Sequence, residues 1–140
     1  MTPQEWAQEQ LKPLSMFETA KWWADGLKVV GAGNGAGFLT AGAALTSFHE
    51  HPRALLEVKF AGVAFFIGIL AFALGFLQVH VAMHAQDEVA QGTMHKDIER
   101  IKTNTLVSGS SMMLANRCAI LSAITFFVGC IIGLIAFVSF

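Results

Sequence analysis

Three long stretches of this chain carry no charged residue, and they limit the possible folds more than any other feature. They cover residues 29–48, 60–78 and 118–140. A helix needs roughly 20 mostly apolar residues to cross a hydrocarbon core about 30 Å thick, because it rises about 1.5 Å per residue. With their apolar neighbours, all three stretches reach that length. We therefore predict three membrane-spanning helices, at residues 27–48, 60–83 and 118–140.

A soluble domain is the alternative, and the composition argues against it. Of the 140 residues, 54% are hydrophobic and 14% are charged, whereas soluble proteins contain about 25% charged residues. A chain of this length has too little interior to bury three helices that are apolar on every face. The formal net charge of −1 argues against a nucleic-acid-binding surface. We expect one all-α domain, an integral membrane bundle of three transmembrane helices.

The segment before the first span, residues 1–26, is predicted to be an interfacial helix. Thr2 and Pro3 form a helix start, as N-cap and N1 residues. Tryptophan prefers the headgroup boundary, because its ring is apolar and its N–H needs a partner. We assign an anchoring role to Trp6, Trp22 and Trp23. The other interpretation is a soluble amphipathic helix that packs on the connection between the second and third spans.

That connection, residues 84–117, is predicted to form a cytoplasmic helical hairpin. Its first half is polar but helix-prone, with apolar residues that recur at helical spacing. The strongest turn signal is the run SGSS at residues 108–111. We therefore expect the turn between residues 103 and 111, and a break in the preceding helix at Gly92.

Positive charges set the predicted orientation. Seven of the nine Lys and Arg residues lie in the N-terminal segment or the hairpin, which share one side in a three-span chain. These seven are Lys12, Lys21, Lys28, Lys96, Arg100, Lys102 and Arg117. Because cytoplasmic loops carry the excess of Lys and Arg, we predict a bacterial inner-membrane protein with a cytoplasmic N-terminus and a periplasmic C-terminus. No signal peptide is expected, and the first span directs insertion.

The stretch VVGAGNGAGFLTAGA, residues 29–43, matches a dinucleotide-binding fingerprint when read alone. That fingerprint needs a preceding strand and a surrounding βαβ sheet, which the second and third spans cannot supply. Small residues instead allow helices to approach closely, because association in lipid depends on packing and hydrogen bonds. The residues predicted to pack helices in this way are Gly31, Gly33, Asn34, Gly35, Gly37, Gly68, Gly75, Gly129 and Gly133.

Asn34 is the most polar residue of the first span. An amide inside a membrane is costly unless it is hydrogen-bonded. It is interpreted either as an interhelical hydrogen bond that sets register or as a pore-lining group. The alternative is local bonding to the backbone of a helix that glycines have loosened.

His80 and His84 are four residues apart on one predicted helix face, a spacing at which two histidines can bind one metal. A catalytic zinc site needs a third ligand, and haem ligation between spans needs a histidine on another span. We therefore favour an interfacial pair that bonds to headgroups and water. No nucleophile has a suitable base, and no ionisable group lies deep in a span. We predict no enzyme activity, no cofactor and no metal, and the missing ionisable groups argue against an ion-coupled transporter.

Three motifs support a resemblance to a known group. They are Asn34-Gly35-Ala36-Gly37 in the first span, FFIGILAFALGFL in the second and LSAITFFVGCIIGLIAF in the third. With them the chain resembles an uncharacterised group of small three-span bacterial inner-membrane proteins, which implies a fold and a location. The size and three-span plan are also similar to succinate dehydrogenase anchor subunits. The Ser-x-x-His-Arg-type motif and the intramembrane haem histidine of those subunits are missing.

These features predict a non-enzymatic membrane protein that acts through helix packing, oligomerisation and partner binding. Its expected partners are the lipid bilayer and either further copies of itself or another membrane protein. The first alternative is a pore-former, holin-like or a defence effector, in which the glycine-rich first span lines an opening. The second is a membrane anchor subunit of a quinone-linked enzyme that uses His80 and His84.

Overall fold

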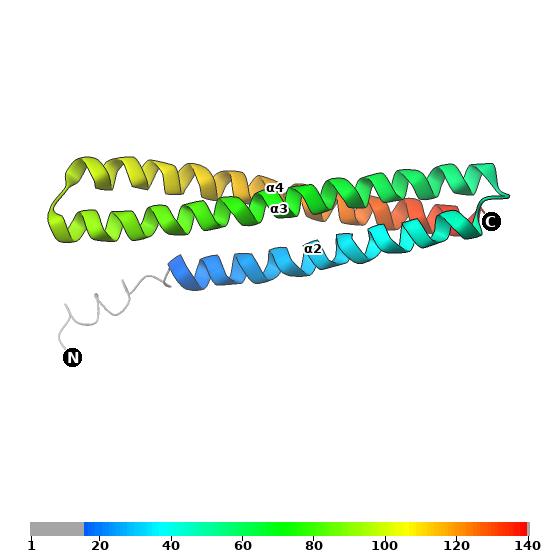
Figure 1. Cartoon of the computed structure of the whole chain (residues 1–140), viewed down its shortest axis with the longest axis horizontal. Coiled ribbons are helices and arrows are strands. Elements are labelled where there is room, and N and C mark those ends of the chain that lie inside the picture. Colours follow the sequence, from blue (N-terminus) through cyan, green and yellow to red (C-terminus); the bar gives the residue numbers. More distant parts are fainter. Residues whose placement is uncertain (1–15, 140) are drawn as a thin grey trace, which may run out of the picture.

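The computed structural model describes residues 16–139, which form three long helices (Figure 1). They are α2 (Met16–Ser47), α3 (Pro52–His95) and α4 (Ile98–Val138). The prediction of an all-α chain is confirmed for these residues. Two of the three helices, α3 and α4, are long and apolar enough to cross a membrane.

α3 and α4 form an antiparallel hairpin that is longer than a membrane is thick (Figure 1). The helices contain 44 and 41 residues, so each is about 60 Å long. The predicted spans at residues 60–83 and 118–140 therefore form only part of their helices. Pro52 is the first residue of α3, a position where its missing N–H leaves no helical hydrogen bond unmade.

The two helices of the hairpin meet along small residues spaced seven apart, which we call the small-residue ladder. Its buried members are Ala54, Ala61, Gly68, Gly75 and Ala82 on α3, and Ser108, Ala115, Ser122, Gly129 and Ala136 on α4. A seven-residue repeat keeps one face of each helix on its partner. Contacts of Ser122 with Gly68, and of Ala115 with Gly75, fix the antiparallel register. Stepping seven residues along both helices then pairs every remaining member with another small residue.

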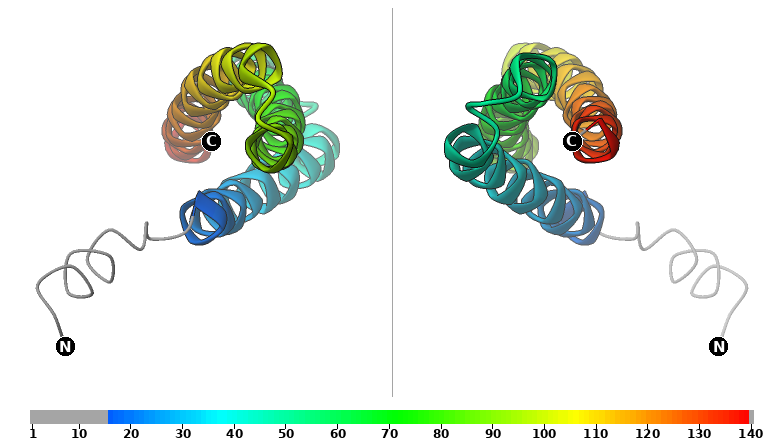
Figure 2. Two further views of the ribbon diagram at one scale, coloured as in Figure 1. Left: turned by 90° about the vertical axis from the view of Figure 1, so that its left-hand side faces the viewer. Right: turned by 90° about the vertical axis from the view of Figure 1, so that its right-hand side faces the viewer.

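α2 packs against the half of the hairpin that lies away from the α3–α4 turn (Figure 1) and crosses it obliquely (Figure 2). It contacts α3 more extensively than α4. Its buried residues, Leu27, Gly31, Asn34 and Ala41, lie on one face, and its opposite face is open. The turn end of the hairpin, formed by residues 84–117, extends past the start of α2, while its residue Ala115 still packs beside Leu27 of α2. We call this part the stalk.

α2 differs from the prediction of a separate interfacial helix at residues 1–26. Residues 16–26 are continuous with the rest of α2, so the helix has no break between Gly26 and Leu27. No proline lies within α2 to interrupt its backbone hydrogen bonds. The predicted helix start at Thr2 and Pro3 lies outside the described residues.

The turn of the hairpin lies at Lys96 and Asp97, so the prediction of a turn between residues 103 and 111 is wrong. Lys96 has a left-handed backbone (φ 56°, ψ 32°) and ends α3. Asp97 begins α4, because its side chain accepts a 3.1 Å hydrogen bond from the backbone N–H of Arg100. The run SGSS at residues 108–111 lies inside α4, where Ser108 is a ladder residue.

Gly92 does not break α3, contrary to the prediction. It is buried, and a Cβ there would lie 3.0 Å from Cγ1 of Ile101 on α4. Its lack of a side chain therefore lets the two helices approach closely just before the turn. Tertiary contact outweighs the weak helix propensity of glycine.

Candidate functional site

One buried polar cluster joins all three helices. Asn34 of α2 and Ser122 of α4 are both 0% exposed. The Asn34 side-chain amide donates to the Ser122 carbonyl oxygen (3.0 Å) and to its Oγ (3.1 Å). The Ser122 hydroxyl in turn donates to the carbonyl oxygen of Gly68 on α3 (2.8 Å). We call Asn34, Ser122 and Gly68 the polar node.

Asn34 makes both kinds of bond that the sequence suggested. Besides its bonds to α4, its amide donates to the carbonyl oxygen of Val30, one turn back in α2 (3.1 Å). Its Oδ1 is buried without a hydrogen-bond partner among the described residues. This oxygen faces Gly68, where any Cβ would overlap the Asn34 carboxamide. The polar node can therefore form only if residue 68 is glycine.

Most of the predicted packing glycines lie where another helix comes close. Gly31 faces the ring of Phe72, Gly33 faces Phe126, Gly37 and Gly129 face Phe65, Gly68 faces Asn34, and Gly75 faces Cys118. On α2, phenyl rings from the hairpin fill the space that the missing side chains leave. α2 therefore contacts the hairpin through glycines that receive phenyl rings. This geometry differs from the direct contact of two glycine-lined helix faces.

Gly35 and Gly133 have open space where a side chain would begin, and Gly133 lines a pocket with Gly37 and Ala41 of α2. No atom of the described chain lies within 4 Å of where a Cβ would lie at either position, apart from the local backbone. Within the pair Gly31 and Gly35, only Gly31 therefore contacts another helix of the same chain.

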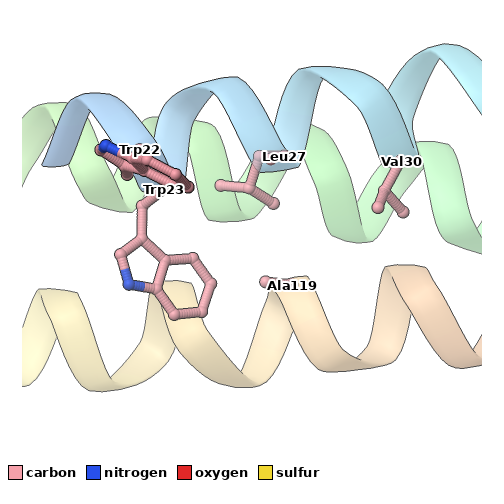
Figure 3. A pocket seen from close by; sticks show the side chains of 6 residues that line it. Trp22, Trp23, Leu27, Val30 and Ala119 are labelled. Carbon is pink, nitrogen blue, oxygen red and sulfur yellow. The ribbon is translucent and has the colours of Figure 1, made fainter. Parts of the chain in front are cut away.

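Trp22 and Trp23 lie near the start of α2, and Trp6 lies outside the described residues. Trp22 and Trp23 line an apolar cavity of about 350 Å³ between α2 and α4. The Trp23 ring extends toward α4 near Ala119, on the side where Leu27 and Val30 also point (Figure 3). Trp22 is 83% exposed. The cavity offers an aromatic, almost wholly apolar surface.

His80 and His84 are both exposed on α3. Between residues 16 and 139, no group of three or more His, Cys, Asp or Glu side chains could hold a metal ion. Neither histidine takes part in the polar node.

Three polar side-chain pairs that the sequence did not reveal join the helices of the stalk. Arg100 Nε donates to Glu88 Oε2 (2.8 Å), and Arg100 Nη2 donates to the same oxygen and to Oε1 of Gln91. The Gln86 amide donates to the Ser108 hydroxyl (2.6 Å). A turn between residues 103 and 111, as predicted, would not bring these residues side by side. The repeat of small residues from Ser108 to Ala136 was the signal that would have placed it.

The polar node can hold helices in register, but it offers no acid–base chemistry. Its side chains are an amide and a hydroxyl, and the Ser122 hydroxyl is already bonded to a backbone carbonyl. No base therefore activates Ser122 as a nucleophile. Comparisons of the chain with protein-family models, with curated proteins and with solved structures find no match.

Proposed function

We propose that this chain is a non-enzymatic, three-span protein of a bacterial inner membrane that acts through helix packing, self-association and partner binding. The observation that carries the proposal is the apolar surface that α3 and α4 leave uncovered. In the most apolar window of each helix, only 33% and 17% of the residues are buried. Apolar surface of that extent is covered by lipid or by other protein.

The third span of the proposal is α2. It is less apolar than α3 and α4, because five glycines, Asn34 and two threonines lie between residues 29 and 46. That stretch nevertheless carries no charge and runs beside the apolar part of α3. Its one amide is buried and hydrogen-bonded, as a polar group in hydrocarbon requires.

The proposed orientation places the stalk in the cytoplasm. The start of α2 lies toward the stalk end of the hairpin, and the end of α4 lies with the α2–α3 connection at the other end (Figure 1). The stalk end carries most of the positive charges. The stalk exposes Met94 (81%) and Ile98 (78%) on either side of its turn. Exposed apolar residues in this position suit contact with a partner protein.

The proposal is tested by fractionation and by reporters fused after Phe140. We expect the protein to stay in the membrane pellet after an alkaline carbonate wash. Alkaline phosphatase fused at this end is expected to be active, and a reporter that works only in the cytoplasm should be dark. Release into the supernatant would contradict the membrane assignment, and the reverse reporter pattern would contradict the orientation.

The stalk is expected to be held closed in part by Arg100 and Glu88. Their side chains are 36% and 28% exposed, so Glu88→Gln should cost at most about 1 kcal/mol. We expect hydrogen exchange of amides near the turn to accelerate severalfold, with no change in the spans. Glu99→Gln is the matched control, because Glu99 is exposed and forms no ion pair within the described chain. Equal effects of the two variants would remove the role assigned to the pair.

The burial of Asn34 favours packing over the pore-forming alternative. A pore-lining amide would face an opening, whereas Asn34 is 0% exposed and bonded to α4. The anchor-subunit alternative would depend on His80 and His84, which lie on an open face of α3.

A further inference from the structure

We propose that the groove between α2 and α3 binds one anionic phospholipid, with an acyl chain in the groove and the phosphate at Lys59. This inference rests on the membrane location proposed above. The groove has a volume of about 570 Å³. It lies near the α2–α3 connection, at the end of the hairpin opposite the stalk.

The shape of the groove follows from glycine on both walls. Gly42 of α2 has no atom within 4 Å of the place where a Cβ would lie, and Gly62 of α3 faces only the Ala41 methyl, at 3.6 Å. The rings of Phe38 and Phe66 lie beside the groove, 5.7 Å apart between centroids. Among the described residues, only the Ala41 methyl approaches the space that these two glycines leave.

The groove is apolar except for Lys59. Seven residues, about 10 Å of helix, separate Lys59 from Phe66, so the charge lies toward one end and the phenyl ring deeper along α3. This arrangement matches a phospholipid, because its charged headgroup would lie at Lys59 and its acyl chain would extend along the apolar groove toward Phe66. The Lys59 stem can lie along apolar surface while its ammonium reaches the headgroup level.

A second observation is that no carboxylate of the described residues neutralises Lys59. Arg53 donates to Glu57 (3.4 Å), and Glu50 lies 3.6 Å from His49. Lys59 forms no ion pair within residues 16–139. An unpaired ammonium at a membrane surface attracts a lipid phosphate. A zwitterionic headgroup carries its own cation beside the phosphate, whereas an anionic headgroup does not, so Lys59 favours an anionic lipid.

The test is native mass spectrometry of the full chain, reconstituted with equal amounts of phosphatidylglycerol and phosphatidylcholine. We expect the wild type to retain phosphatidylglycerol preferentially, and Lys59→Gln to lower that preference about fivefold. Lys102→Gln on the stalk is the charge control. Gly42→Leu should fill the groove and reduce retention of both lipids, whereas Gly109→Leu, at another open glycine, should not.

Each result has a separate meaning. Equal retention of the two lipids by the wild type would overturn the site. An unchanged preference in Lys59→Gln would overturn the phosphate contact, and unchanged retention in Gly42→Leu would overturn the groove as the acyl site. If Gly42→Leu altered only the oligomeric state, a second copy would be the occupant and the lipid proposal would fail. Release of the protein by the carbonate wash would overturn the membrane assignment and the lipid site together.

Discussion

Gly68→Ala is expected to destabilise the chain by about 1–3 kcal/mol, the usual cost of forcing an extra group into packed space. The new Cβ would overlap the Asn34 carboxamide. Either α2 must move away from α3, or Asn34 must give up its bonds to Ser122. The measurement is reversible unfolding in mixed micelles. Gly109→Ala on the stalk is the matched control, because no atom lies within 4 Å of a Cβ there.

The sharper form of this prediction is a double-mutant cycle. Asn34→Ala removes the carboxamide, so Gly68→Ala should cost much less in that background than in the wild type. Asn34→Ala alone should cost between about 0.6 and about 1.7 kcal/mol, the average and the maximum of measured hydrogen-bond contributions between membrane helices. We expect a coupling free energy of about 1 kcal/mol or more between the two sites. Strict additivity would show that the two residues do not compete for the same space.

Gly35→Leu is expected to weaken self-association while leaving the fold of each chain intact. No neighbouring atom of the described chain lies within 4 Å of the place where a Cβ of residue 35 would lie, so a side chain there starts in open space. If the outer face of α2 packs against a second copy, the bulk of leucine should lower the association constant about tenfold, about 1.4 kcal/mol. Sedimentation or cross-linking in detergent measures the change.

Gly31→Leu is the informative partner of that variant. Gly31 lies four residues away on α2 but faces the Phe72 ring of its own chain, with a Cβ position 2.6 Å from that ring. We expect this substitution to destabilise the packing of α2 on α3. If Gly35→Leu left the oligomeric state unchanged, the self-association part of the proposed function would be wrong.

The helical class could be read from the sequence, because it depends on local composition. Long runs without charge, such as residues 118–140, exclude most alternatives to an apolar helix. Asn34 was also recognisable, since a buried amide must find a partner somewhere. Its partner Ser122 was not recognisable, because serine is common in such helices and only the register between α2 and α4 brings the two together.

The turn shows where sequence reasoning reached its limit. Ser108 and Gly109 look like a turn when they are judged by local propensity, yet both lie well inside α4. Small residues have two uses, since they form turns and they also allow close helix contact. The seven-residue repeat decides between these uses, because it runs from Ser108 to Ala136 within α4 and α3 carries a matching repeat.

The sequence by itself determined that this chain is helical, that α3 and α4 are long and apolar, and where its charges lie. These properties follow from side-chain chemistry along one segment at a time. The tertiary structure decided which glycines face inward, where the hairpin turns, and that Asn34, Ser122 and Gly68 meet. Those outcomes depend on how far each helix is rotated and shifted against its neighbours, and many small contacts between distant residues set that rotation.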